Sequence, residues 1–158
     1  MGFRLSDTTE VVLENVRVPR SAVIGEVGCG MSIALNALTL SRAFISTLAV
    51  GIMQRALDEA VAYAKQRKQF GKRLIDFEMV QQMLADMAIK TEAARVLVNN
   101  CMRQMDAGEM VRKDGAIVKT FVTDAMQEVV SNAVQVLGGY GYSEEYPVEK
   151  LMRDAKIF

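Results

Sequence analysis

The densest group of residues that could do chemistry is a basic segment in the middle of the chain. Its cations are Lys65, Arg67, Lys68, Lys72 and Arg73, and Phe70-Gly71 lies among them. An arginine presents a planar fork that binds two phosphate oxygens at once, and an aromatic ring beside it adds a stacking surface. The same cations are also expected at the solvated C-terminal end of a helix, where they interact favourably with the helix dipole. The residues alone leave these two interpretations evenly balanced.

The chain contains no histidine, which excludes several common kinds of catalysis. Its 158 residues include 19 Lys and Arg, 19 Asp and Glu, and no His. Ser-His-Asp and Cys-His catalysis, the HExxH zinc site and a histidine proton relay are therefore ruled out. The net charge of zero argues against a nucleic-acid binder that depends on excess positive charge. Chemistry must use carboxylates, tyrosine, cysteine, lysine or a bound cofactor.

Two further motifs could do chemistry, but each has a simpler structural explanation. Gly25, Gly28 and Gly30 precede a helix and could hold an anion on backbone amides. Their order differs from the dinucleotide fingerprint GxGxxG, so a flexible turn is favoured. Glu144 and Glu145 could form an acid–base pair, but adjacent acids before a helix more often stabilise its N-terminus.

The cysteines and the chain's apolar segments bear on its compartment. Cys29 and Cys101 have neither CxxC nor metal-ligand spacing, and we expect both to be reduced, buried thiols of an intracellular protein. The N-terminus lacks the apolar core of a signal peptide. The most apolar stretch, 43–53, is too short to cross a bilayer, so no membrane span is expected.

Helical periodicity predicts four helices, at about residues 32–66, 77–105, 111–137 and from Pro147 towards the C-terminus. Ser32 is the candidate N-cap of the first helix, and Gly138-Gly139 are the candidate C-terminal cap of the third. Steady apolar stripes on the second and third helices are typical of an antiparallel bundle. The sequence therefore predicts an all-α protein, an antiparallel four-helix up-and-down bundle.

Apolar residues at helical spacing define the expected inward faces. In the first helix these are Leu38, Ile45, Leu48, Ile52, Ala56 and Ala60. In the second they are Val80, Leu84, Met87, Thr91, Ala94, Val98, Cys101 and Met105. In the third they are Val118, Val122, Ala125, Val129, Ala133 and Val136, and in the fourth Val148, Leu151, Met152 and Ala155. The first helix is apolar on other faces too, so we expect it to be central in the bundle or buried in an oligomer.

The first 24 residues differ from the rest. The valine-rich segment 10–18 alternates in part and is stopped by Pro19, which predicts one strand. A single strand cannot form a sheet domain, so we expect 1–24 to be the remnant of a β-domain and 25–158 to be the bundle. The fourth helix is still amphipathic at Phe158, which predicts a truncated chain that stops in mid-helix.

Four separated motifs resemble the acyl-CoA dehydrogenase family. They are RKQFGKRLIDF at 67–77, LADMA at 84–88, QVLGGYGY at 135–142 and EYPVEKLMRDAKI at 145–157. The segment SDTTEVVLENVRVP at 6–19 is similar to the last strands of the family's middle β-domain. The resemblance covers essentially the whole chain in the family's order.

This resemblance implies the C-terminal bundle of an FAD-dependent enzyme. The intact enzyme would dehydrogenate acyl-CoA thioesters at the α and β carbons and pass electrons to an electron-transfer flavoprotein. Family members usually assemble as homotetramers through this bundle, and a bacterial cytoplasm or a mitochondrial matrix is the implied location. These 158 residues would be inactive alone. An acyl-CoA oxidase-like flavoenzyme domain and a non-enzymatic helical oligomerisation module stay open as alternatives.

The resemblance also implies site residues. The implied cofactor-binding residues are Arg67, Gln69, Phe70, Glu78, Gln135, Gly138 and Gly139. Arg67 would contact the FAD pyrophosphate of a neighbouring subunit. Thr39 and Arg42 occupy positions that line the acyl-CoA site.

Two positions depart from the family pattern. Glu78 stands where relatives usually have glutamine, and a carboxylate there would repel a diphosphate unless it is paired. Ser41 stands where some relatives carry the base glutamate, and most relatives have the base just after the fourth helix. No catalytic residue can therefore be assigned within this chain.

Overall fold

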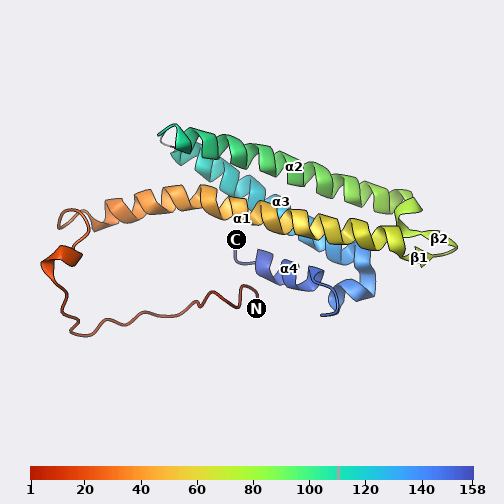
Figure 1. Ribbon diagram of the computed structural model, residues 1–158, viewed down its shortest axis with the longest axis horizontal. Helices are drawn as coiled ribbons and strands as arrows, with labels where there is room; N and C mark the ends of the chain where they lie inside the picture. Colours follow the sequence, from red (N-terminus) through yellow and green to blue (C-terminus); the bar gives the residue numbers. More distant parts are fainter. Residues whose placement is uncertain (110) are drawn as a thin grey trace.

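The computed structural model describes residues 1–109 and 111–158, and four α-helices dominate it (Figure 1). The helices are α1 (Gly30–Gln66), α2 (Glu78–Asp106), α3 (Arg112–Leu137) and α4 (Val148–Ala155). Short 3-10 helices are η1 (Arg20–Ala22), η2 (Leu74–Asp76) and η3 (Gly138–Tyr142). Two short antiparallel strands, β1 (Lys68–Gln69) and β2 (Lys72–Arg73), complete the elements. The all-α bundle is confirmed.

The inward faces of α2 and α3 are those that the periodicity predicts. α3 contacts each of the other three helices, and α1 and α2 lie beside it (Figure 1). The buried residues of α2 are Leu84, Met87, Thr91, Ala94, Val98 and Cys101. In α3 all six residues of the predicted stripe are buried. The buried hydroxyl of Thr91 donates to the carbonyl of Met87 at 2.8 Å, so this polar group costs the core little.

The inward face of α1 is partly different from the predicted one. Ala56 and Ala60 are fully buried as expected, but Leu38 and Leu48 are 57% and 54% exposed. The packed face of α1 consists mainly of small residues, namely Thr39, Ala43, Ser46, Ala49, Val50, Met53, Ala56, Ala60 and Ala64. Small side chains allow neighbouring helices to approach closely, and the leucines are left on a face that no described helix covers.

Two smaller expectations about burial are wrong. Met152 of α4 is 44% exposed, because the short helix turns only Val148, Asp154 and Ala155 fully inward. Cys101 is buried in the core, as predicted, whereas Cys29 is exposed in the loop before α1. Both cysteines are free thiols.

α1 is by length and composition able to cross a membrane. Core helices of soluble proteins pass the same test, so the property is weak evidence of a span. Here α1 packs against α2, α3 and α4 along one face.

The N-terminal segment contradicts the predicted strand. In the described part of the chain, residues 10–18 form no strand and are exposed. A strand needs a neighbour for its backbone N–H and C=O groups, and within residues 1–109 and 111–158 no other strand lies beside this segment. The tail instead returns to α4, so the two termini lie close together (Figure 1). There the N–H of Phe3 donates to Asp154 Oδ1 at 2.6 Å, and the ring of Phe3 lies 5.5 Å from that of Phe158.

The helix ends include two corrections and one confirmation. α1 begins at Gly30 and Ser32 is not its N-cap; the Ser32 hydroxyl donates to the carbonyl of Cys29 at 2.7 Å. α4 ends at Ala155, three residues before Phe158, and its last backbone bonds are turns. Gly138 ends α3 as predicted, with a φ of 59° that glycine adopts without strain, but its ψ of −133° lies outside the left-handed helical region expected of the cap.

Candidate functional site

The basic segment forms a hairpin that projects beyond the end of α1. α1 ends at Gln66, and strands β1 and β2 pair across the turn Phe70-Gly71. Both turn residues have positive φ, 51° and 83°, which is the geometry of a type I′ turn. The hairpin tip therefore carries Phe70 into solvent, 93% exposed. The periodicity of apolar residues does not indicate this hairpin. The available signal in the sequence is the pair Phe70-Gly71 between two short polar segments.

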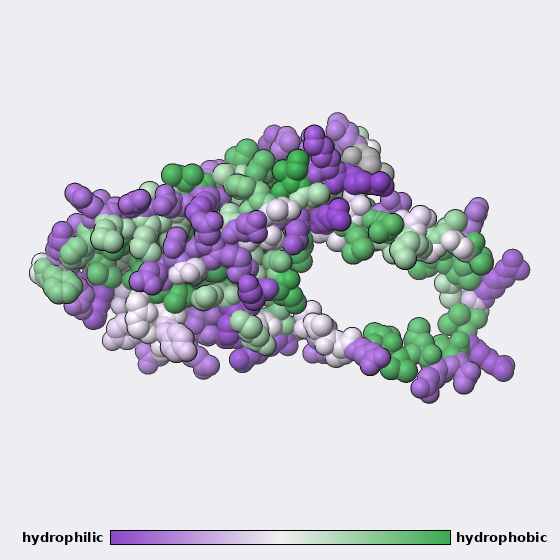
Figure 2. All heavy atoms as spheres, turned by 180° about the vertical axis from the view of Figure 1, so that it is seen from behind, coloured by the Kyte–Doolittle hydropathy of each residue, from purple (hydrophilic) through white to green (hydrophobic). Residues whose placement is uncertain are grey.

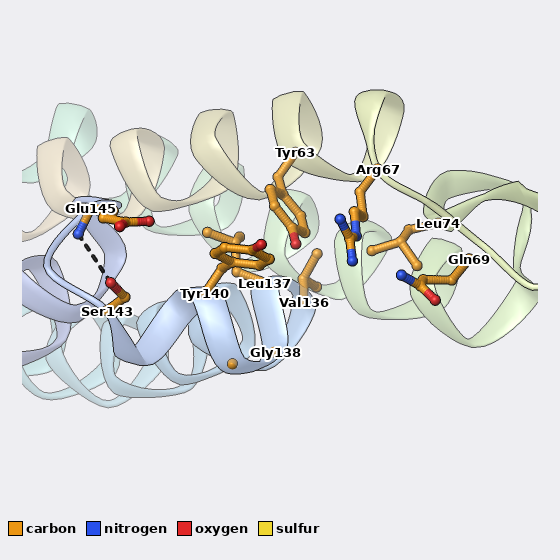
Figure 3. Close-up of a pocket in the computed structure, with 11 residues that line it drawn as sticks. Tyr63, Arg67, Gln69, Leu74, Val136, Leu137, Gly138, Tyr140, Ser143 and Glu145 are labelled. Carbon is orange, nitrogen blue, oxygen red and sulfur yellow. Dashed lines mark hydrogen bonds between the residues drawn. The ribbon is translucent and has the colours of Figure 1, made fainter.

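A pocket of about 710 Å³ lies between the C-terminal end of α1, the end of α3 and η3. Four of the seven predicted cofactor-binding residues line it, namely Arg67, Gln69, Gly138 and Gly139 (Figure 3). These residues are up to 72 positions apart in the sequence, between Arg67 and Gly139. The fold thus brings an arginine fork, an amide and a glycine turn to one cavity.

The other three predicted residues lie outside the lining of this pocket. Phe70 is at the hairpin tip, and Gln135 is exposed on α3, where its backbone carbonyl accepts from the N–H of Gly138. Glu78 is exposed at the first residue of α2, and among the described residues it forms no ion pair. A carboxylate in the first turn of a helix is stabilised by the helix dipole, which accounts for Glu78 without a ligand.

Three tyrosines form an aromatic cluster at the pocket that sequence reasoning missed. Tyr63 of α1 lies 5.5 Å from Tyr146 and 6.2 Å from Tyr140, ring centre to ring centre. Tyr140 and Tyr146 are 5.7 Å apart in a T-shaped arrangement. Burial raises the pKa of the Tyr63 phenol, and the nearby Arg67 cation lowers it by less. Tyr63 could have been found because it lies in the last turn of α1, four residues before Arg67, which directly follows the helix.

Arg67 is held by neutral groups. Its guanidinium carbon lies 5.5 Å from the ring centre of Tyr140. With the Gln69 amide oxygen turned towards it, Arg67 donates to that oxygen from Nη2 at 2.7 Å and from Nε at 3.3 Å. The cationic charge is therefore oriented, and no carboxylate of the described residues forms an ion pair with it.

Gly141 fixes the position of η3 against α3. A Cβ at Gly141 would lie 2.4 Å from the carbonyl oxygen of Val134, so only glycine permits this contact. A Cβ at Gly138 or Gly139 would have no atom within 4 Å apart from those of its chain neighbours. Glycine is needed at position 141 because the backbone of α3 packs so closely against it, and at position 138 because φ is positive there.

The predicted substrate residues belong to a second region of α1. Thr39 and Arg42 line a smaller pocket of about 220 Å³ with Arg112, the first residue of α3. The Thr39 hydroxyl donates to the carbonyl of Leu35 at 2.9 Å, so it is satisfied within its own helix. Arg42 and Arg67 are separated by roughly 37 Å along the helix axis. The structure thus brings Thr39 and Arg42 together, with Arg112 added.

The larger pocket suits a ligand with a diphosphate and an aromatic part. Arg67 and the glycine turn offer donors to phosphate oxygens, and the tyrosine rings offer stacking surface. The carboxylate of Glu145 also lines the pocket, at the end away from Arg67 (Figure 3). Within the described ranges, no group of three or more His, Cys, Asp or Glu residues could hold a metal ion. The donor set fits an organic anion.

Comparison with known proteins supports one family. The family described as "Acyl-CoA dehydrogenase, C-terminal domain" matches residues 28–158. The chain is 48% identical to "Probable acyl-CoA dehydrogenase FadE25" of Mycobacterium tuberculosis, over 99% of this chain and 41% of that protein. It is 42% identical to "Caffeyl-CoA reductase-Etf complex subunit CarC" of Acetobacterium woodii, over 100% of this chain and 42% of that protein.

A solved structure shares the fold. Butyryl-CoA dehydrogenase from Megasphaera elsdenii superposes with a TM-score of 0.90 at 45% identity, covering 92% of this chain and 38% of that one. The chain therefore spans 42% or less of the length of these relatives. The match extends over the bundle and all four motifs of the sequence. The chain belongs to the acyl-CoA dehydrogenase family and corresponds to its C-terminal helical domain.

Proposed function

We propose that this chain works as the C-terminal bundle of an FAD-dependent acyl-CoA dehydrogenase, which removes hydrogens from the α and β carbons of an acyl-CoA thioester. The observation that carries the proposal is the convergence of Arg67, Gln69, Gly138 and Gly139 on one pocket. Relatives that match the whole chain are named as a dehydrogenase and a CoA-thioester reductase.

The residues of the pocket have separate tasks in this proposal. Arg67 binds the cofactor diphosphate through its guanidinium fork, and backbone N–H groups at Gly138 and Gly139 donate to further phosphate oxygens. Gln69 orients the guanidinium through its amide oxygen. FAD, when bound, supplies the redox chemistry that no side chain of this bundle can provide.

Thr39 and Arg42 serve the substrate in the same proposal. They line a pocket separate from that of Arg67 and adjoin a wider apolar groove of about 650 Å³, which Arg42 also lines. Arg42 binds an oxygen of the CoA portion, and the buried Thr39 sets the close approach of α1 to α3 beside it. The backbone carbonyl of Thr39 lies 3.5 Å from a Cβ built on Gly115 of α3, which supports that close approach.

The proposed electron acceptor is an electron-transfer flavoprotein. The relative from Acetobacterium woodii is named as a subunit of an Etf complex, which favours this acceptor over oxygen. The alternative is an acyl-CoA oxidase-like enzyme. Rapid reoxidation of the reduced flavin by oxygen in the full-length protein would support the oxidase.

Assembly and location complete the proposal. We propose a homotetramer, because several large apolar side chains of α1 are exposed on the chain alone. A bundle that served only for oligomerisation would need no arginine directed into a glycine-lined pocket. We propose a bacterial cytoplasm as the location, since the relatives described above come from bacteria.

The decisive experiment compares Arg67→Ala with Arg73→Ala in the full-length protein. We expect Arg67→Ala to weaken FAD binding by about tenfold or more, because a charge-assisted contact contributes roughly 1.5–3 kcal/mol. Arg73→Ala is the matched control: Arg73 lies on the same hairpin, but its Nη2 pairs with Asp76 Oδ1 at 2.9 Å. The measurement is the FAD dissociation constant, from quenching of flavin fluorescence by the apoprotein. Equal effects of the two substitutions would mean that the basic segment is a solvated surface without a specific contact to FAD.

A further inference from the structure

The tyrosine cluster is assembled from three separate parts of the chain. Tyr63 comes from α1, Tyr140 from η3, and Tyr146 from the segment before α4. Their ring centres lie 5.5 to 6.2 Å apart, with two pairs edge to face and the Tyr63–Tyr140 pair tilted, a spacing at which aromatic pairs attract each other. Each ring therefore restricts the other two, and the position of Tyr140 depends on both neighbours.

Arg67 differs from the arginines of the bundle that pair with acids. Arg55, Arg73, Arg95 and Arg153 each form an ion pair with a carboxylate three or four residues away. Arg67 instead lies over the Tyr140 ring, and it donates to the Gln69 amide oxygen when that oxygen is turned towards it. A carboxylate would orient the guanidinium but also neutralise it. A ring and an amide orient it and leave its charge available to an anion.

The charge of Arg67 stays available to an anion only while the Tyr63 phenol beside it is neutral. The pKa of Tyr63 is raised, chiefly by burial, so the phenol beside Arg67 stays uncharged through the physiological range. A phenolate there would compete with a bound anion for the guanidinium. The neutral Tyr63 phenol avoids that competition.

We propose that Tyr140, itself held by Tyr63 and Tyr146, is a positioning residue that directs the Arg67 guanidinium at the cofactor diphosphate. This inference rests on the proposed function, because it takes the anion in the pocket to be the diphosphate of FAD. Tyr140 acts through its ring face and through no contact of its hydroxyl. The hydroxyl of Tyr140 accordingly forms no hydrogen bond among the described residues.

The test uses Tyr140→Leu and Tyr140→Phe in the full-length protein, with the FAD dissociation constant as the readout. We expect Tyr140→Leu to weaken binding by roughly three- to thirtyfold, the range of one cation–π contact. Tyr140→Phe keeps the aromatic ring, so its FAD dissociation constant should stay within about twofold of that of the parent protein. Tyr142→Leu is the matched control, because Tyr142 lies two residues further on and is 89% exposed outside the cluster.

A double-mutant cycle separates positioning from general support of the fold. In an Arg67→Ala background, Tyr140→Leu should cause no further loss of FAD binding, because the residue through which it acts is gone. Equal losses in both backgrounds, or a loss in Tyr140→Phe as large as in Tyr140→Leu, would overturn the positioning role. If Arg67→Ala itself leaves FAD binding unchanged, the proposed cofactor site fails instead.

Discussion

The two halves of α1 use their apolar residues in opposite ways. In the first half, Gly30 to Leu48, the exposed large apolar side chains are Met31, Ile33, Leu35, Leu38, Leu40, Phe44 and Leu48. Between Ala49 and Gln66, a stretch that the structure describes throughout, no large apolar side chain is exposed. The second half buries alanines and Met53 against its neighbours.

The second half of α1 therefore buries its apolar side chains within this chain, whereas the first half leaves its large apolar side chains exposed. The second half packs beside α2 and α3 and leads directly to the Arg67 pocket. The first half extends away from α2 towards the tail (Figure 1). Apolar atoms line both sides of the opening between the tail and the bundle (Figure 2). Contiguous apolar surface of this kind is typical of an interface, so we expect the first half to make contacts beyond this bundle.

The largest expected effect is in the packed half. Met53 is fully buried, and Met53→Ala should lower the free energy of unfolding by about 2–5 kcal/mol, because it leaves a cavity in the core. Leu48→Ala, the matched control in the exposed half, should change it by no more than about 0.5 kcal/mol when the chain is dilute enough to be monomeric. Urea unfolding followed by circular dichroism measures both values. A large cost at Leu48 would mean that the exposed half is packed in the chain after all.

The second expected effect concerns association. At micromolar concentration we expect the 158-residue chain to self-associate through the exposed half, and the double substitution Phe44→Glu with Leu48→Glu should shift it towards monomer. Both side chains line the apolar groove of α1, and burying a carboxylate in an interface is unfavourable. Sedimentation velocity reports the distribution.

Met79→Glu is the control for that experiment. Met79 is 80% exposed at the start of α2, outside the groove, so its substitution should leave the distribution unchanged. A monodisperse monomer of the unsubstituted chain would contradict the proposed role of the exposed half.

Sequence periodicity predicted the helices well and the packed face of α1 poorly. On α2 only one stripe is apolar enough to be buried, so Leu84 to Cys101 could be assigned directly. On α1 several faces are apolar, and periodicity cannot tell which of them another helix meets. The face of α1 that packs is the one with small side chains, because helices that approach closely favour alanine over leucine at the contact. A pattern of apolar and polar residues does not contain information on side-chain size.

The site was predicted in part for a similar reason. The resemblance named Arg67, Gln69 and the glycines through short motifs, and the structure brings these residues to one pocket, while their role in binding a cofactor stays a prediction. It gave no account of how the guanidinium is held, since Tyr63, Tyr140 and Tyr146 come together only through the fold. The strand expected at 10–18 is absent because a strand depends on a partner that its own residues cannot provide.

The smallest expected effect tests how the tail before α1 is fastened at its far end. Asp154 is 7% exposed; burial raises its pKa, but Lys150 and the N–H of Phe3 lower it by more, so the net pKa is below the usual value. Because the folded pKa is depressed, the stabilisation is fully present above the unfolded value of about 3.9 and is lost as pH falls through the folded pKa.

Asp154→Asn should therefore lower the free energy of unfolding by about 1 kcal/mol at pH 6, and the difference from the parent chain should shrink as the pH falls below about 3.9. Asp76→Asn is the control, because the pKa of Asp76 is also lowered, first by its hydrogen bond with Arg73, but on an exposed hairpin. An exposed ion pair contributes little to stability, so its substitution should leave the pH profile nearly unchanged. Urea unfolding between pH 3 and pH 6 gives the profiles. If the free energy of unfolding of Asp154→Asn depends on pH as that of the parent chain does, the contact between Asp154 and Phe3 does not hold the tail against α4. The tail that precedes the exposed half of α1 would then be free of the bundle at its N-terminal end.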